Sequence, residues 1–166
     1  MVQSLEKDLQ TRNGTSVKIL EIGPGTGIFT EAIQSLIRPY DHFDVIEQNE
    51  HFYDLIYSRF QNGNTKVYHG DVLQYQANSS YDFIFSSVPY ESLPEDISTQ
   101  IWQKKLELSH QGTIITYYKY LKPNQFRCSF EKETVKRYLI EDKVILRNIP
   151  PAKMYTLCIN QQDELS

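Results

Sequence analysis

Residues 19–28 read Ile-Leu-Glu-Ile-Gly-Pro-Gly-Thr-Gly-Ile, and this stretch decides the fold. The apolar run over residues 17–22 ends at a glycine cluster, which predicts a buried strand. Gly23, Gly25 and Gly27 occupy alternate positions, where a backbone without side chains can turn sharply and come within contact distance of a ligand. A helix is predicted from Gly27 onward, and the N–H groups of its first turn are unpaired. The stretch therefore predicts a strand, a ligand-binding loop and a helix.

The spacing of these glycines and the charge beside them indicate which ligand the loop binds. The glycines follow a GxGxG pattern, whereas a dinucleotide-binding loop has GxGxxG. Glu21 stands two residues before the first glycine, and its carboxylate would repel a pyrophosphate. The pattern thus favours S-adenosylmethionine, whose sulfonium and amino groups are positive, over a nicotinamide dinucleotide.

Two further carboxylates follow the next two predicted strands. Glu47 closes the strand Phe43–Glu47, where an acid can accept hydrogen bonds from both ribose hydroxyls of an adenosine. Asp71 follows the strand Lys66–His69, where it could take the adenine amino group. Either carboxylate alone would be an ordinary loop residue. Carboxylates at the ends of three successive strands predict an adenosine-binding edge of a sheet.

Strands and helices alternate along the rest of the chain. This alternation predicts an α/β fold with a mostly parallel sheet, in one domain over residues 1–166 with a short N-terminal segment, 1–16, and a tail, 160–166. The stretch 119–130 is expected to be irregular. The other predicted elements are helices from Gly27 to Arg38-Pro39, Asn49 to Gly63, Pro94 to His110 and Glu131 to Leu139, and strands Tyr81–Ser87, Thr113–Tyr118, Lys143–Asn148 and Met154–Ile159.

The composition is that of a globular protein and excludes several classes. The chain has 166 residues, of which 40% are hydrophobic and 23% charged, so a collagen-like or disordered chain is excluded. No apolar stretch reaches the roughly 20 residues of a membrane span, and the first residues carry no secretory signal. Cys128 and Cys158 form no CxxC pair, which argues against a disulfide framework and a zinc site. We therefore expect a cytoplasmic protein without a metal.

Charge is distributed unevenly along the chain. Residues 1–103 carry six basic and fourteen acidic side chains, whereas residues 104–153 carry eleven basic and five acidic ones. One basic face turned toward phosphates would explain this asymmetry. Ordinary solvated helix surfaces would explain it equally well.

The order of these motifs resembles the class I S-adenosylmethionine-dependent methyltransferases, from about Val17 to Ile159. The resemblance implies a Rossmann-like sheet of seven strands in the order 3-2-1-4-5-7-6, with strand 7 antiparallel and helices on both faces. It also implies that S-adenosylmethionine is converted to S-adenosylhomocysteine. The residues that it places at the cofactor are Glu21, Gly23, Gly25 and Gly27 at the methionine part, Glu47 at the ribose, Asp71 and Val72 at the adenine, and Ser86 at the end of the fourth strand.

The end of the fourth predicted strand bears on the methyl acceptor. In the related enzymes that methylate the amino group of adenine, this place reads Asn/Asp-x-Pro-aromatic. The present chain keeps Pro89 and Tyr90 but has Ser87 in place of the amide. A serine hydroxyl offers fewer hydrogen bonds than an amide does. By this resemblance Ser87, Pro89 and Tyr90 are the predicted catalytic residues.

Two short segments resemble the bacterial phospholipid N-methyltransferases, which methylate phosphatidylethanolamine. One is Phe85–Pro89 followed by Leu93-Pro94, and the other is Arg147–Tyr155. The resemblance implies an anionic or zwitterionic phospholipid as acceptor, with the protein peripheral to a membrane surface. Aromatic rings such as that of Tyr90 would hold the ammonium group by cation–π attraction.

Two other functions remain open. An rRNA adenine N-methyltransferase, with RNA as partner, is favoured by Pro89-Tyr90 and the basic second half, although the C-terminal helical domain of those enzymes is not seen. A cofactor-binding module without catalysis is favoured by the N-terminus, where sixteen residues precede Val17 and related enzymes carry a longer helical lid. In that case a protein partner or a lipid surface would complete the site.

Overall fold

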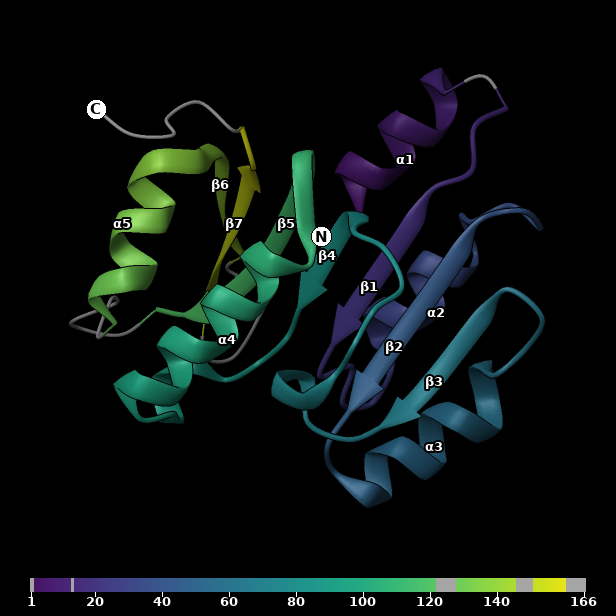
Figure 1. Cartoon of the computed structure of the whole chain (residues 1–166), viewed down its shortest axis with the longest axis horizontal. Helices are drawn as coiled ribbons and strands as arrows, with labels where there is room; N and C mark the ends of the chain where they lie inside the picture. Colours follow the sequence, from purple (N-terminus) through teal and green to yellow (C-terminus); the bar gives the residue numbers. More distant parts are fainter. Residues whose placement is uncertain (1, 13, 122–127, 146–150, 161–166) are drawn as a thin grey trace.

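The computed structural model describes residues 2–12, 14–121, 128–145 and 151–160. Its strands form one sheet in the order β3-β2-β1-β4-β5-β7-β6. Strand β7 is antiparallel to both neighbours and the other pairs are parallel, as the opposed arrow of β7 shows (Figure 1). The predicted Rossmann-like sheet and its strand order are confirmed. The strands are β1 (Lys18–Ile22), β2 (His42–Glu47), β3 (Thr65–His69), β4 (Tyr81–Ser86), β5 (Ser109–Tyr120), β6 (Leu139–Ile145) and β7 (Ala152–Cys158).

Helices cover both faces of the sheet. Buried side chains of α1, α2 and α3 share one hydrophobic core with the strands, and those of α4 and α5 share another on the opposite face. Two single turns of 3-10 helix, η1 (Val72–Gln74) and η2 (Tyr90–Ser92), follow β3 and β4. The α-helices are α1 (Gln3–Thr11), α2 (Ile28–Gln34), α3 (Glu50–Phe60), α4 (Glu95–Glu107) and α5 (Ser129–Tyr138).

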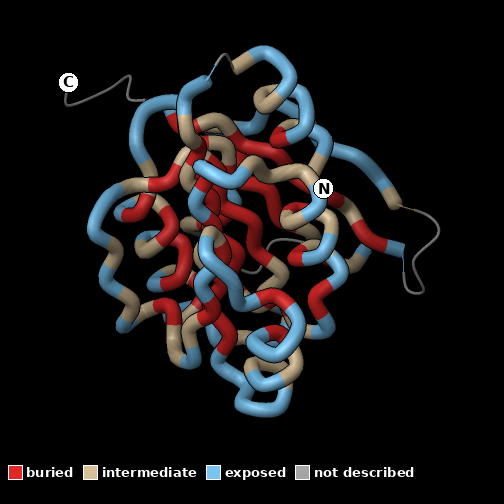
Figure 2. The backbone as a smooth tube through the Cα atoms, turned by 90° about the vertical axis from the view of Figure 1, so that its right-hand side faces the viewer, coloured by how far each residue is buried: buried red, intermediate tan, exposed pale blue. Residues whose placement is uncertain are grey.

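Alternate side chains of the central strands supply the two cores. In β1, Ile19 belongs to the core under α1–α3, whereas Leu20 and Ile22 belong to the core under α4 and α5. Because both faces of these strands are covered, apolar residues stand at adjacent positions, as in Ile19-Leu20, Val45-Ile46 and Phe83-Ile84-Phe85. The buried residues accordingly run through the middle of the molecule (Figure 2).

The N-terminal helix α1 packs away from the glycine loop. It lies beside the start of β1, at the edge of the sheet opposite to the arrowheads of the parallel strands (Figure 1). Leu5 is fully buried in the core under α1–α3, and Arg12, just beyond the helix, forms an ion pair with Asp82 of β4 at 3.1 Å. The weak apolar face of this segment is thus enough to anchor a helix.

Three elements differ from those predicted. Helix α2 ends at Gln34, before Arg38-Pro39. Strand β5 begins before Gly112 and takes in the first residues of the stretch expected to be irregular, because it pairs with β4 from Ser109 and with β7 as far as Tyr120. Strand β6 begins at Leu139, and six of its seven residues are exposed, so no apolar alternation marks it. The end of the predicted strand, residues 146–148, lies outside the described residues.

Gly27 has no room for a side chain. Its φ is +84°, and a Cβ there would lie 2.5 Å from Ile56 Cδ1 and 2.8 Å from Phe60 Cε2. Gly27→Ala should therefore destabilise the protein by about 2–4 kcal/mol, through backbone strain and overpacking together. Gly14→Ala is the matched control, because Gly14 has a φ of +76° with nothing within 4 Å of its Cβ position, and should cost about 1 kcal/mol. Urea unfolding measures both changes in the free energy of unfolding. An equal decrease in the two variants would contradict the packing argument.

Candidate functional site

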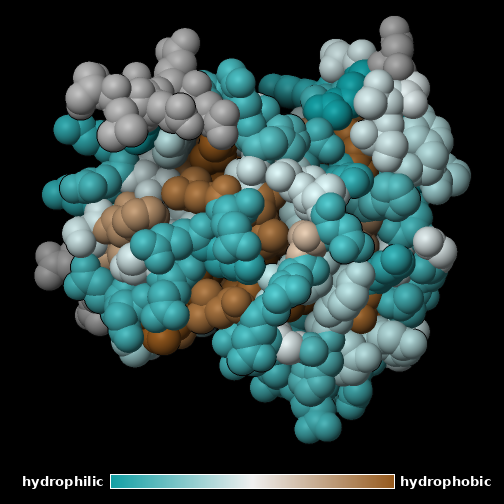
Figure 3. Space-filling model, viewed as in Figure 1, coloured by the Kyte–Doolittle hydropathy of each residue, from teal (hydrophilic) through white to brown (hydrophobic). Residues whose placement is uncertain are grey.

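A cavity of about 570 Å³ opens at the edge of the sheet where β1 to β4 end. Helix α4 borders it, and hydrophobic residues gather on both sides of this helix in the space-filling view (Figure 3). A volume of this size is typical of small-molecule and cofactor sites. Of the predicted site residues, Gly23, Gly25, Glu47, Asp71, Val72, Ser87 and Pro89 line the cavity, and Glu21, Gly27, Ser86 and Tyr90 do not.

The glycine loop is tied to the end of β2. Gly23, Gly25 and Gly27 all have positive φ, at +68°, +56° and +84°, which glycine adopts without strain. Gly23 N–H donates to the Ile46 carbonyl at 2.9 Å, and Gly25 N–H donates to Glu47 Oε2 at 3.1 Å. The loop therefore has a defined shape against β2.

Glu47 joins this loop to two others. Its Oε1 accepts from the N–H of Asn49, the N-cap of α3, at 2.8 Å, and its backbone carbonyl accepts from Gly70 N–H at 3.0 Å. Each carboxylate oxygen can accept a second hydrogen bond. Glu47 lines the cavity, so it retains acceptor capacity for the hydroxyl groups of a ligand.

Asp71 and Val72 form an adjoining wall of the cavity. Asp71 Oδ1 accepts from Leu73 N–H at 2.9 Å and so starts η1, which sets Val72 into the core under α4 and α5. Ile46 and Phe52 also line the cavity. An apolar wall with one carboxylate at its border suits a purine ring with an amino group.

Glu21 lies under the glycine loop rather than in the cavity. The side chain is fully buried, its Oε2 accepts the Thr30 hydroxyl at 2.8 Å, and its Oε1 has no partner among the described residues. Burial raises the pKa of Glu21 to about 8; the Thr30 hydrogen bond opposes this shift, and the charge of Glu47 adds to it. A positive group brought near the loop would stabilise the ionised carboxylate.

The end of β4 places its two serines differently. Ser86 is buried, and its Oγ is 2.9 Å from the Tyr90 hydroxyl. Ser87 donates its backbone N–H to the Ile22 carbonyl at 2.9 Å, and its Oγ is buried without a hydrogen-bond partner among the described residues. Ser87 lines the cavity, but its Oγ is enclosed by the protein and is not exposed to the cavity.

Tyr90 points into the core rather than into the cavity. It is 3% exposed, and its ring lies 5.8 Å from those of Trp102 and Tyr117, centroid to centroid. The Tyr90 ring points inward because it packs on Trp102 of α4. The local sequence motif around Tyr90 gives no information about this tertiary contact. Tyr90 thus supports the lining segment from behind, and no face of its ring is turned toward a ligand in the cavity.

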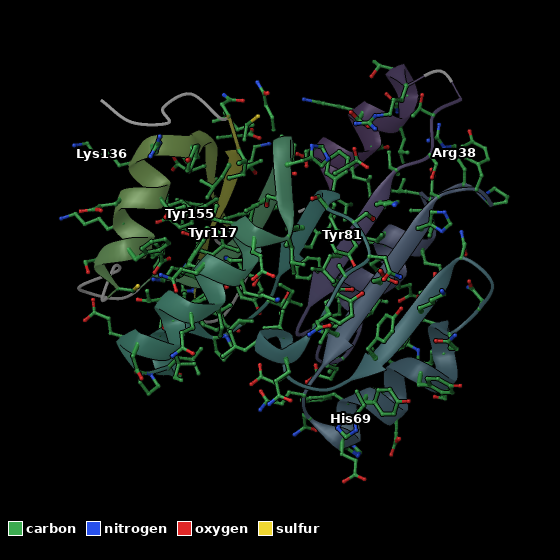
Figure 4. All side chains as sticks on the ribbon, viewed as in Figure 1. Arg38, His69, Tyr81, Tyr117, Lys136 and Tyr155 are labelled. Atoms are coloured by element: carbon green, nitrogen blue, oxygen red, sulfur yellow. The ribbon has the colours of Figure 1, made fainter. Side chains whose placement is uncertain are left out.

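Some site features were not predicted from the motifs. Ile97 and Ile101 of α4 line the cavity, and no motif marks them as site residues. Two cations of the basic second half, Lys105 and Lys119, are buried, so the basic residues do not all form one surface. His69, at the end of β3 beside α3, is exposed and stacks on Tyr53 at 4.8 Å (Figure 4).

The cavity fits S-adenosylmethionine in charge and in polarity. The carboxylates of Glu21 and Glu47 lie at the glycine loop, where a cationic group would be stabilised. Within the cavity itself, the carboxylates of Glu47 and Asp71 stand beside the apolar residues Val72 and Phe52, a combination that suits a nucleoside. At Gly25 a close approach is possible, because nothing lies within 4 Å of its Cβ position.

Comparison with known proteins identifies the family. The family model described as ribosomal RNA adenine dimethylase matches residues 3–143. The chain belongs to this family. It is a methyltransferase, and S-adenosylmethionine is its cofactor.

The individual relatives of this chain are named for different methyl acceptors. An ornithine lipid N-methyltransferase from Singulisphaera acidiphila is 30% identical over 147 residues, which are 82% of this chain and 73% of that protein. A ribosomal RNA small subunit methyltransferase A from Mycoplasma capricolum is 32% identical over 98 residues, 55% of this chain and 34% of that protein. The solved N-methyltransferase NodS from Bradyrhizobium japonicum WM9, in complex with S-adenosyl-L-homocysteine, shares the fold at a TM-score of 0.72 and 15% identity, covering 96% of this chain and 85% of that one.

Replacing the Glu47 carboxylate should weaken cofactor binding. S-adenosylhomocysteine at about 100 Kd should stabilise the wild-type protein by about 2.7 kcal/mol, which thermal unfolding will show as a higher Tm. Glu47→Gln leaves only one acceptor oxygen for the N–H groups of Gly25 and Asn49, so most of this shift should disappear. Glu50→Gln, an exposed acid three residues along, is the matched control and should keep it. An unchanged shift in Glu47→Gln would remove Glu47 from the site.

Proposed function

We propose that this methyltransferase N-methylates an amine in a lipid head group at a membrane surface. The observation that carries the proposal is the extent of the likeness to the ornithine lipid enzyme, which covers most of both chains. The likeness to the ribosomal RNA enzyme covers only a third of that protein. The proposed acceptors are the amines of ornithine lipid and of phosphatidylethanolamine.

On the cofactor side, the proposed binding residues are those that surround the glycine loop. Glu21, Gly23, Gly25 and Gly27 would hold the methionine part, Glu47 the ribose, and Asp71 and Val72 the adenine, with Ser86 supporting the end of β4. The lining positions of Glu47, Asp71 and Val72 support this assignment. When bound, S-adenosylmethionine supplies an electrophilic methyl group.

On the acceptor side, the chain has to present a nitrogen with its lone pair free. Ser87 lines the cavity, and its enclosed Oγ has no partner among the described residues. Rotation of this side chain toward the cavity would let the hydroxyl accept an N–H of the amine and orient the lone pair away from itself. Pro89, Leu93 and Ile97 surround the same end of the cavity and exclude water. Positioning and desolvation are the main contributions that such a transfer needs from the protein. The acceptor is an ammonium in water and gives one proton to solvent before transfer, and the nitrogen is positively charged again once it has gained the methyl group.

Exposed apolar residues at the same edge of the sheet support a lipid surface as the source of the acceptor. Ile28, directly after the glycine loop, is 70% exposed, and Leu121, directly after β5, is 37% exposed. Because β5 is parallel to β4, both residues lie at the edge where the cavity opens. No helix in the described parts of the chain is long and apolar enough to cross a membrane. We propose a peripheral contact with the lipid surface.

RNA is the second candidate acceptor. The match to the ribosomal RNA adenine dimethylase model and the retained Pro89-Tyr90 pair favour it. Ser87 in place of the amide and the limited overlap with the ribosomal RNA relative speak against it.

Labelled methyl transfer will distinguish these acceptors. The protein and labelled S-adenosylmethionine are incubated with vesicles carrying ornithine lipid, vesicles carrying phosphatidylethanolamine, or unmodified ribosomal RNA. We expect label in lipid, and none in pure phosphatidylcholine vesicles, whose nitrogen is already fully methylated. Label in RNA alone would overturn the lipid proposal. Label in no acceptor, from protein that binds the cofactor, would favour a module without catalysis of its own.

The exposed isoleucine offers a test of the membrane contact. Ile28→Ser should reduce transfer to vesicles about tenfold, because the loss of one apolar anchor of roughly 1–2 kcal/mol lowers the bound fraction. Ile140→Ser is the matched control, since Ile140 is 58% exposed on β6, away from the cavity. Equal vesicle flotation and equal rates for the two variants would place the contact elsewhere.

A further inference from the structure

Helix α4 buries a lysine that has no hydrogen-bond partner among the described residues. Lys105 is 0% exposed, and its Nζ lies among aromatic rings. The nitrogen is 2.9 Å from the ring centroid of Trp102, 4.8 Å from that of Tyr90 and 5.0 Å from that of Tyr117. A methionine would fill the same space without the cost of removing a polar group from water. The lysine therefore needs a functional explanation.

The charges around Lys105 favour an uncharged amine. Glu131 of α5 is already paired with Lys119 at 2.7 Å, and its other oxygen accepts the Tyr117 hydroxyl at 2.9 Å. A second buried cation would give this interior a net positive charge. Burial accordingly lowers the pKa of Lys105 well below its ordinary value; Glu131 opposes the shift, and Lys119 adds to it.

Several elements bring titratable groups to this cluster. Tyr117 of β5 stacks on Tyr155 of β7 at 5.2 Å, and the two rings lie side by side between α5 and the sheet (Figure 4). Lys104 of α4, whose side chain is 11% exposed, pairs with the exposed Glu107 at 2.8 Å. The groups around Lys105 are Tyr90 from η2, Tyr117 and Lys119 from β5, Cys128 and Glu131 at the start of α5, and Tyr155 from β7.

Lys105 adjoins the acceptor end of the cavity. Ile97 and Ile101 line the cavity, and Lys105 is the next residue on the same face of α4, one turn further along. Tyr90, whose ring lies against the lysine, directly follows Pro89, another lining residue. A change at Lys105 can therefore reach the acceptor through Tyr90.

We propose that Lys105, as an uncharged amine among three aromatic rings, is a positioning residue that holds Tyr90 and, through it, the acceptor segment 87–89. Its N–H groups can point at the ring faces, which a methionine cannot do. Protonation adds a charge that no free carboxylate of this interior balances, because Glu131 is already paired with Lys119, and an unbalanced buried charge favours local opening toward water around Tyr90. Transfer should therefore fall toward acid pH. The inference rests on the proposed transfer to an amine nitrogen, whether a lipid or an RNA carries it.

The fluorescence of Trp102 reports on this lysine directly. Trp102 is the only tryptophan of the chain, and its ring is the one nearest to Lys105 Nζ. As the pH is lowered through the range in which the wild-type protein stays folded, the Trp102 emission should change in one step as Lys105 takes up a proton, well below the ordinary pKa of a lysine. The step should vanish in Lys105→Met and persist in Lys104→Met, the matched control on the same helix. A wild-type step near pH 10.5, the ordinary pKa of a lysine, or a step that survives in Lys105→Met, would overturn the uncharged amine.

Stability and transfer should change in opposite directions in Lys105→Met. The Tm should rise at pH 7, and the gain should shrink as the pH approaches 10.5, where the unfolded lysine also loses its proton. In Lys105→Met, S-adenosylhomocysteine should raise the Tm by as much as it does in the wild type. The kcat of the variant should be lower about tenfold or more. The decrease of kcat toward acid pH should disappear. Wild-type kcat in this stable variant would overturn the positioning role.

Hydrogen exchange separates this inference from the proposed function. If the wild-type protein labels neither lipid nor RNA, the proposed function fails, but the position of Tyr90 can still be measured. Backbone amides of residues 90–93 should exchange faster in Lys105→Met than in the wild type and in Lys104→Met. Equal exchange in all three proteins would show that Lys105 does not hold this segment.

Discussion

The Glu47 carboxylate is the interaction on which the site depends. One oxygen accepts from Gly25 in the loop after β1, the other accepts from Asn49 at the start of α3, and the backbone carbonyl accepts from Gly70 after β3. The loops that follow β1, β2 and β3 are thereby fastened to one residue, the first two through its carboxylate and the third through its backbone. The cavity is shaped before any ligand enters it, so little of the binding free energy has to be spent on ordering the loops.

Local chemistry explains which parts of this arrangement could be predicted. The glycines at 23, 25 and 27 and the acids at 47 and 71 stand at strand ends, and the ends of parallel strands meet at one edge of a sheet. The sheet order followed from the resemblance, and the structure confirms it. Strand β6 was misplaced because its exposed residues show no alternation.

Side-chain direction could not be predicted in the same way. Tyr90 follows Pro89 in a motif that suggests an aromatic platform, yet packing against Trp102 turns its ring inward. Lys105 is four residues after Ile101 on the apolar stripe of α4, but a lysine ordinarily indicates a solvated position. Lys105 is buried because residues of β5 and α5 pack against this face of α4. That contact is a feature of the tertiary structure and cannot be inferred from the sequence of α4.

Strand β6 has a consequence for the behaviour of the protein in concentrated solution. It is the outer strand of the sheet beside β7, and its exposed Ile140 and Val144 would make a ready template for the strand of another molecule. Charged residues stand between them, with Lys143 paired to Glu141 at 2.9 Å and Asp142 paired to Lys153 of β7 at 2.7 Å. A second strand could dock here only by stripping water from these ion pairs, so the free edge opposes aggregation between neighbouring copies.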